Sequence, residues 1–403
     1  MRICIDTSTL RVRHGGIAIY TLNLVQELTG LMSSTDALLA FDGWEGFRPI
    51  DPGWVQAMRS ANSDHVGAGL PRSRSVPSFF EAAMRAGSLG RWALRRAKEA
   101  RFALARDRYD LCHAVVTLPP GPTSKPLIPL IHDISMHRFP EVHPAERLRA
   151  FDRWWPKILQ SPVINTVSNF SRDEITAVLG FPRERIVVTH PGVEPFYFGQ
   201  DPAGEQAVLS ELSLEGRRII LIVGSQEPRK NVAVALRAFA ALPTRVRAGL
   251  VLVVAGGRGW GDVVRPADVE ALMRAGDIRF TGYVSRLLLR ALYRRSCLLV
   301  YPSIYEGFGI PVIEALACGS RVAVSAGGAL VEAAGPFGDA IESGDVDAWS
   351  RAMEAAASGP NVADRERTER RAWAARFTWK STAEKTMTMY RSVFNISDAS
   401  QHS

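Results

Sequence analysis

Cysteine is scarce in this chain of 403 residues, and its four cysteines lie far apart, at positions 4, 112, 297 and 318. None of them has a second cysteine at the spacing of a zinc ligand pair, and their neighbours are mostly hydrophobic. We therefore expect neither a disulfide framework nor a zinc site, and we expect the protein to work in the reducing cytoplasm.

Long hydrophobic runs are also missing. The longest, residues 250–255, is far shorter than the roughly 20 residues that a membrane-spanning helix needs. The amino-terminal residues lead straight into the strand pattern of residues 3–6, without the apolar region of a secretory signal. These absences predict a soluble cytoplasmic protein, or one that binds the inner membrane face peripherally.

The size and charge of the chain set wider limits. Its length and a hydrophobic content of 46% favour two well-packed domains. A net charge of +8 predicts an electropositive surface. Such a surface suits phosphorylated ligands, anionic lipid headgroups or nucleic acid, and it does not choose among them.

Apolar segments alternate with amphipathic stretches along both halves of the chain, which is typical of parallel sheets built from βα units. We expect strands near residues 2–6, 111–116, 127–132, 163–167, 219–224, 250–256, 278–281, 297–301 and 322–325. A loop-rich passage, residues 191–216, separates the two series. The pattern predicts two Rossmann-like sheets, with the ligand site in a cleft between them.

The most informative segment is residues 301–319, where Glu306 and Glu314 stand either side of seven residues that contain a glycine turn. We expect Glu306 in a loop after a buried strand and Glu314 about one turn into the following helix. The amino end of a helix offers free N–H groups and the positive end of the dipole to an anion. The segment therefore predicts a phosphate-bearing ligand whose sugar or ribose hydroxyls bond to the two carboxylates.

Four other segments carry candidate site residues. Each of them can also be explained by an ordinary structural role. Gly15 and Gly16 follow the first strand, where glycines admit a diphosphate but also serve any tight turn. His132 and Asp133 end another strand; a strand-end histidine is more often structural, and Asp133 could orient it or cap a helix.

The last two of these segments lie in the second half. Arg229 and Lys230 are adjacent cations at a helix start, suited to a leaving diphosphate, although an isolated pair is usually solvated. Residues 281–284 end a strand whose backbone could read a nucleotide base, and an ordinary loop explains them equally well.

Together these segments resemble the retaining glycosyltransferases of the GT-B architecture, in the group 1 or family 4 class that includes bacterial mannosyltransferases and sucrose-phosphate synthases. The resemblance covers nearly the whole chain, with further matches at residues 166–172, 190–194 and 377–380. It implies an acceptor-binding Rossmann-like domain (1–195), a nucleotide-sugar-binding Rossmann-like domain (205–376) and a final helix (377–395) that packs back on the first domain.

The resemblance also assigns roles to residues. It implies that Glu306 faces the donor sugar, Glu314 the ribose and Lys230 the diphosphate, and it makes His132, Glu306 and Lys230 the catalytic residues. The implied donor-binding set is Gly15, Gly16, Arg229, Lys230, Gly282, Tyr283, Val284, Glu306, Gly307, Phe308, Gly309, Ile310 and Glu314. One departure is Ser225, where many relatives carry arginine, so that Arg229 and Lys230 would have to do more.

The form of residues 224–231, with residues 256–260 downstream, is most similar to the branch that uses GDP-mannose to build bacterial polysaccharides. The expected reaction is transfer of mannose, with retention of the α configuration, to a saccharide or lipid-linked saccharide. We expect no metal or other cofactor, because the cations and helix ends stabilise the leaving group. Asp345 and Asp347 spell D-x-D, yet they better suit a helix cap.

Two alternative enzymes fit the same scaffold: a transferase that uses a UDP-sugar as donor, and a sugar-nucleotide 2-epimerase. A nucleic-acid binder ranks well behind, because it leaves the glutamate pair and His132 unexplained, so we expect no nucleic-acid partner. The basic region 85–108, within a segment that holds eight Arg or Lys, is first interpreted as a helix whose apolar stripe packs on the first domain. The sharper interpretation is docking on an anionic membrane surface.

Overall fold

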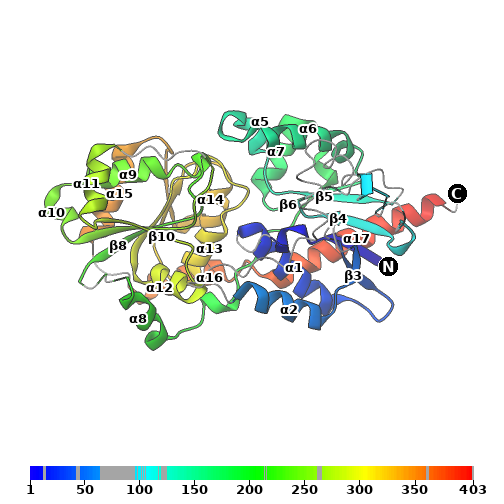
Figure 1. Cartoon of the computed structure of the whole chain (residues 1–403), viewed down its shortest axis with the longest axis horizontal. Coiled ribbons are helices and arrows are strands. Elements are labelled where there is room, and N and C mark those ends of the chain that lie inside the picture. Colours follow the sequence, from blue (N-terminus) through cyan, green and yellow to red (C-terminus); the bar gives the residue numbers. More distant parts are fainter. Residues whose placement is uncertain are drawn as a thin grey trace.

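The computed structural model describes residues 1–11, 15–41, 46–63, 96–97, 99–100, 102, 104, 106–116, 118, 125–212, 214, 216–260, 266–359 and 363–401. Within these residues the chain forms two α/β domains, each built on one sheet, and the two sheets lie side by side along the long axis of the molecule (Figure 1).

The first domain contains a seven-stranded sheet in the order β3-β2-β1-β4-β5-β6-β7. Its strands are β1 (Arg2–Asp6), β2 (Ala37–Phe41), β3 (Phe47–Pro49), β4 (Leu111–Ala114), β5 (Leu127–Ile131), β6 (Ile164–Thr166) and β7 (Ile186–Val188). Its helices are α1 (Gly16–Leu31), α2 (Pro52–Ser63), α5 (Ser135–Arg138), α6 (Ala145–Leu159) and α7 (Asn169–Leu179). Neighbouring strands are parallel except β3, which pairs antiparallel with β2 at the edge.

The second domain contains a six-stranded parallel sheet in the order β10-β9-β8-β11-β12-β13. Its strands are β8 (Arg218–Val223), β9 (Leu250–Ala255), β10 (Ile278–Gly282), β11 (Ser296–Tyr301), β12 (Val322–Ser325) and β13 (Gly338–Ile341). Its helices are α8 (Pro202–Ser210), α9 (Val232–Ala240), α10 (Thr244–Arg247), α11 (Ala267–Arg274), α12 (Arg286–Arg295), α13 (Ile310–Ala317), α14 (Ala329–Ala334), α15 (Val346–Ser358) and α16 (Asp364–Ala374).

The order of the strands decides where loops can form a site. In the first sheet the chain proceeds from β1 to β2 on one side and from β4 to β5 on the other, and in the second sheet β8 and β11 divide the order in the same way. Loops that leave two such neighbouring strands in opposite directions open a crevice at their carboxyl ends. The strands themselves are buried apolar runs such as β9, which is buried throughout, because helices cover both faces.

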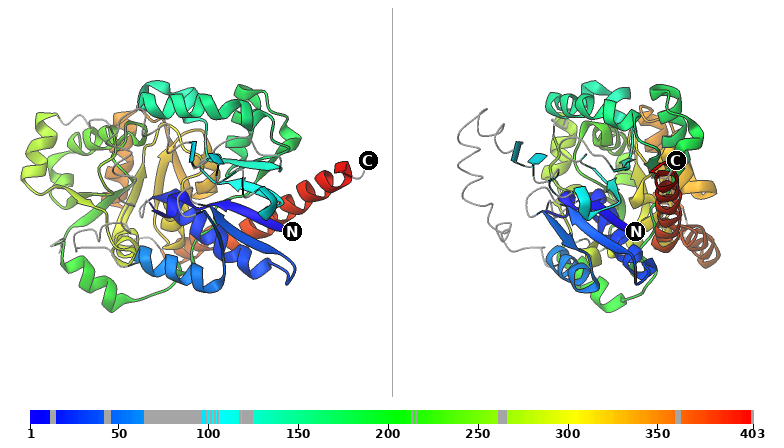
Figure 2. Two further views of the ribbon diagram at one scale, coloured as in Figure 1. Left: turned by 45° about the vertical axis from the view of Figure 1, so that its right-hand side comes forward. Right: turned by 90° about the vertical axis from the view of Figure 1, so that its right-hand side faces the viewer.

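The last helix, α17 (Trp379–Gln401), returns to the first domain and packs beside α1. There the hydroxyl of Tyr390 lies 2.6 Å from Nδ1 of the buried His113, and Trp379 packs edge-on against Tyr20. A Cβ on Gly192 would lie 2.1 Å from the Trp379 backbone nitrogen, so the connection between the domains can run here only as glycine. Both termini consequently lie at the end of the molecule formed by the first domain (Figures 1 and 2).

All nine expected strands are present, within two residues of the expected bounds. The sequence pattern missed β2, β3, β7 and β13. Three of these, β3, β7 and β13, are edge strands of three or four residues, and β3 includes Pro49. Such short or half-exposed stretches show little periodicity. Asp345 caps α15, as expected, since its carboxylate accepts a hydrogen bond of 2.8 Å from the Ala348 N–H.

The basic region 85–108 lies largely outside the described residues. Of its described apolar side chains, Phe102 is buried and packs against Phe41 and Tyr109 of the first domain, as the first interpretation of this region predicts, whereas Leu104 is 85% exposed. Among the helices that the structure describes, none is both long and apolar enough to cross a membrane.

Candidate active site

Three ionised side chains meet where the central strands β8 and β11 of the second sheet end. Arg229 and Lys230 lie in the short helical turn η6 (Pro228–Lys230) after β8, and Glu306 lies in the loop after β11. Lys230 Nζ is 2.5 Å from Glu306 Oε1, and an Arg229 guanidinium nitrogen is 2.8 Å from Oε2. Each carboxylate oxygen of Glu306 therefore has its own cation.

These charges are largely withdrawn from water. Burial alone would raise the pKa of Glu306, but the positive charges of Arg229 and Lys230 outweigh it and lower the pKa to about 2. Burial alone would likewise lower the pKa of Lys230, and the negative charge of Glu306 reverses this and raises it. All three groups are therefore ionised at neutral pH.

The two loops that carry these charges are fastened to one another. The Ile304 N–H donates to the Arg229 carbonyl at 2.9 Å, and the Arg229 guanidinium donates to the Tyr305 carbonyl at 2.8 Å. Asn231 adopts a left-handed φ of 53° and donates its amide to the carbonyls of Pro302 and Ser343. The ion pairs thus rest on a rigid backbone frame.

His132 approaches this frame from the other domain. A Cβ on Gly307 would lie 2.2 Å from the His132 carbonyl oxygen, so the two backbones can meet only because residue 307 has no side chain. The ring of Tyr20 packs edge-on against His132, at 5.4 Å between centroids. Burial lowers the pKa of His132 to about 4, and its buried Nε2 atom has no partner among the described residues. A neutral imidazole with a free nitrogen can hydrogen-bond to a hydroxyl.

The segment after Gly307 turns into α13. Phe308 is buried against His190 and Phe377, so its side chain belongs to the core and only its backbone can meet a ligand. Gly309, with a φ of 106°, allows the turn that starts the helix at Ile310.

Glu314, in the second turn of α13, is buried too, and its Oε2 accepts a hydrogen bond of 3.0 Å from the Tyr293 hydroxyl. Burial raises the pKa of Glu314 to about 8. The carboxyl group therefore carries its proton at neutral pH, in contrast to Glu306. Its expected contact with a ribose stays a prediction.

The remaining predicted residues lie at other strand ends. Gly282 ends β10, and Tyr283 and Val284 follow it. The Gly282 carbonyl accepts a 2.8 Å bond from the Gly256 N–H, and a Cβ on Gly256 would lie 2.0 Å from the Gly224 carbonyl oxygen. Lys230 also packs near Gly224, so this set adjoins the ion pairs. Tyr283 is about half exposed.

Gly15 and Gly16 stand at the start of α1 in the first domain. Gly15 has a φ of 136°, and no atom of the described residues lies within 4 Å of a Cβ added at either position. The positive φ explains why residue 15 is a glycine. Close packing against the described residues explains neither Gly15 nor Gly16.

Sequence reasoning missed several residues that support the site. Glu227 bonds to the Ser225 hydroxyl at 2.5 Å and lies 3.5 Å from the Arg229 guanidinium, and the Tyr301 hydroxyl accepts a 2.8 Å bond from Lys230. Tyr301 ends the buried strand β11, so a polar group at a strand end was the available signal. In the described part of the chain no group of three or more His, Cys, Asp or Glu side chains could hold a metal ion.

The sequence matches known families along both domains. Residues 14–195 match the family described as Glycosyltransferase Family 4, and residues 208–373 match Glycosyl transferases group 1. The chain is 31% identical over 393 residues to the O-antigen chain mannosyltransferase B of Escherichia coli, which covers 97% of this chain and 100% of the relative. The chain belongs to the group 1 glycosyltransferases.

Other relatives of this glycosyltransferase match over shorter stretches or through the fold. A D-inositol 3-phosphate glycosyltransferase of Mycolicibacterium paratuberculosis is 34% identical over 219 residues, 51% of this chain and 47% of the relative. The sucrose-phosphate synthase of Thermosynechococcus elongatus has a TM-score of 0.67 at 19% identity, and HepE of Anabaena, solved with UDP and glucose, has 0.64 at 16%. These structures cover 97% or more of this chain and 100% of their own, and they confirm the GT-B fold.

We predict that Gly307→Ala lowers kcat of the glycosyltransferase by about 100-fold, because a methyl group there pushes the Glu306 loop away from His132 by an ångström or more. Steady-state kinetics with a nucleotide sugar would measure this. Gly344→Ala is the matched control, since its Cβ would meet no described atom within 4 Å. Equal activity of the two variants would contradict the prediction.

We predict a pH-dependent stability penalty from Glu314. Its pKa is about 8 in the folded protein and 4.5 ordinarily, so between these values the folded state binds more protons than the unfolded state, and stability falls as pH rises. Relative to the unsubstituted protein, Glu314→Gln should gain about 1.4 kcal/mol of unfolding free energy per pH unit in this window. Urea unfolding at pH 5, 6, 7 and 8 would measure it. A difference between Glu314→Gln and the unsubstituted protein that stays constant from pH 5 to pH 8 would contradict the prediction.

Proposed function

We propose that this glycosyltransferase moves mannose from GDP-mannose to a saccharide or lipid-linked saccharide, with retention of the α configuration, in the synthesis of a bacterial polysaccharide or glycolipid. The observation that carries the proposal is the buried set of Arg229, Lys230 and Glu306 facing His132 across the domain boundary. The choice of mannose is supported by the full-length relative, an O-antigen chain mannosyltransferase.

The two cations suit the diphosphate of a nucleotide sugar. Their side chains are each 14% exposed, so a phosphate oxygen that reaches them meets positive charge in a medium of low dielectric constant, where its stabilisation is large. The diphosphate takes over the two cations, and the Glu306 carboxylate then accepts hydrogen bonds from the sugar hydroxyls. Ser225 supplies no charge where many family members carry arginine, so Arg229 and Lys230 neutralise the leaving group.

The lack of a strong nucleophile or base in this set supports retention. Glu306 has a pKa of about 2 and His132 a pKa of about 4, which makes both of them weak bases. The acceptor hydroxyl therefore attacks on the side from which the diphosphate departs. The bond from the anomeric carbon to the phosphate oxygen breaks, the bond to the acceptor oxygen forms, and the proton passes to the departing phosphate.

This scheme requires no divalent cation, because fixed positive side chains take the place of a metal at the diphosphate. The acceptor binds to loops of the first domain. An anionic membrane surface, held by the basic region 85–108, would bring a lipid-linked acceptor to those loops.

We predict that GDP-mannose raises the melting temperature more than other GDP- and UDP-sugars do, since ligand binding to the folded state stabilises it. With lipid-linked oligosaccharide, the product should carry α-mannose by nuclear magnetic resonance, and EDTA should leave the rate unchanged. If a UDP-sugar stabilises the protein selectively, the proposed donor GDP-mannose is wrong. A product with β configuration would overturn retention. Activity that EDTA removes and manganese restores would overturn metal independence. Conversion of the sugar in donor alone would indicate an epimerase.

We predict that Lys230→Ala loses about 100- to 1,000-fold in kcat, the usual cost of removing one group that stabilises developing negative charge. Its fold should persist, because Arg229 still pairs with Glu306. Circular dichroism and kinetics would measure both properties. Lys380→Ala, at an exposed position of α17, is the matched control. Turnover of Lys230→Ala close to that of the control would be strong evidence against the proposed role.

A further inference from the structure

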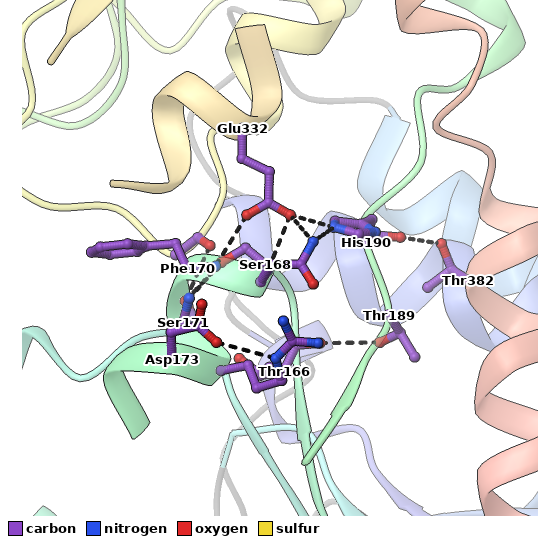
Figure 3. Close-up of polar contacts among 12 residues, drawn as sticks. Thr166, Ser168, Phe170, Ser171, Asp173, Thr189, His190, Glu332 and Thr382 are labelled. Atoms are coloured by element: carbon purple, nitrogen blue, oxygen red, sulfur yellow. Dashed lines mark hydrogen bonds and ion pairs between the residues drawn. The ribbon is translucent and has the colours of Figure 1, made fainter. Parts of the chain in front are cut away.

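Glu332 of α14, in the second domain, bonds to four groups of the first domain (Figure 3). Its Oε1 accepts hydrogen bonds from the Asn169 backbone N–H at 3.0 Å and from the Asn169 side-chain amide at 2.7 Å, and it lies 2.6 Å from His190 Nε2. Its Oε2 accepts a bond of 3.1 Å from the Phe170 N–H. Both oxygens are therefore used across the domain boundary.

The bonded N–H groups are the exposed donors at the amino end of α7, a helix of 11 residues. Within the first domain, the Ser168 hydroxyl accepts a bond of 2.9 Å from the Ser171 N–H. The N–H groups of Asn169 and Phe170 donate to Glu332. A carboxylate here also gains from the positive end of the helix dipole. Burial alone would raise the pKa of Glu332, but the bonds from His190 and α7 outweigh it and lower the pKa, so the carboxylate is ionised at neutral pH.

The partners of Glu332 lead directly to the active site. In the first turn of α7, the Ser171 hydroxyl lies 3.2 Å from the His132 carbonyl oxygen and 3.3 Å from that of Gly307. It touches the two backbones whose close approach joins the domains. The ring of His190 packs against Phe308, at 5.7 Å between centroids, so this partner of Glu332 contacts the segment that follows Glu306.

We propose that Glu332 is a positioning residue of the transferase reaction: by clasping α7 and His190 it fixes the distance between Glu306 on one domain and His132 on the other. Its role in catalysis rests on the proposed function of that site, whereas its role as a clasp between the domains does not. Glu332 itself touches neither sugar nor diphosphate, and acts through Ser171 and His190.

A purely structural role would have different consequences. If Glu332 only stabilised α7, its loss would lower the melting temperature and leave the domain spacing and kcat unchanged. Asp345 provides the comparison, because its carboxylate also caps a helix, α15, but with one N–H bond inside the second domain.

The experiment compares Glu332→Ala, Glu332→Gln and Asp345→Ala in the full chain. Spin labels on cysteines introduced at the exposed positions Arg153 and Arg274, on α6 and α11, report the distance between the domains without any substrate. We expect Glu332→Ala to broaden and lengthen the distance distribution. With GDP-mannose and acceptor, its kcat should fall about 10- to 100-fold, and its KM for the donor should change less than about threefold, since the cations that hold the donor are untouched.

Glu332→Gln should restore part of the spacing and of kcat, because its amide oxygen still accepts a bond from one of the two α7 N–H groups. Asp345→Ala should lose melting temperature alone. An unchanged distance distribution in Glu332→Ala would overturn the clasp, whatever the activity, and a changed distribution with kcat equal to that of Asp345→Ala would overturn the positioning role. If the unsubstituted protein transfers no sugar from any of the donors, the proposed function is wrong. The distance measurement would still show whether Glu332 holds the two domains together.

Discussion

The site depends on one interaction, the double ion pair that Glu306 makes with Arg229 and Lys230. A buried charge is tolerable only with partners, and removal of one partner from such a set typically costs about 3–5 kcal/mol. The parallel sheet makes the set possible, because β8 and β11 are neighbours whose following loops diverge. Both strands end at the same edge of the sheet, so the first residues of the two loops lie close together and their charged side chains can meet.

The same ion pairs explain how a site can be both preformed and ready for an anion. Two adjacent cations without a counter-charge would repel each other and would be costly to bury. Glu306 supplies that counter-charge from the loop that also meets the other domain at Gly307. Its motif thus combines four constraints in four residues: a charge at Glu306, a close backbone contact at Gly307, a core side chain at Phe308 and a left-handed turn at Gly309.

The resemblance to the glycosyltransferases, and not the pattern itself, assigned Arg229, Lys230 and Glu306 to one site. Sequence periodicity predicted the central strands, because each is a local feature: a buried run followed by a polar loop. It could not predict Glu332, whose partners Asn169 and His190 are 163 and 142 residues away along the chain. A glutamate on a short helix looks like a solvated side chain until the fold brings another helix end to it. The edge strand β3 was missed for a local reason: it has three residues, one of them a proline, and so short a segment shows almost no hydrophobic pattern.

The two glutamates of the motif show how environment, more than residue type, sets chemical character. Both are buried, yet two cations hold Glu306 ionised, whereas burial outweighs the hydroxyls of Tyr293 and Tyr197 at Glu314, which keeps its proton near neutrality. An ionised carboxylate only accepts hydrogen bonds, while a protonated one also donates. Glu306 therefore suits the donor hydroxyls of a sugar beside two cations, and Glu314 suits a ribose hydroxyl, which offers both a proton and lone pairs. Burial removes the charge of Glu314, so of the two carboxyl groups in the motif only that of Glu306 is ionised and pairs with the two cations.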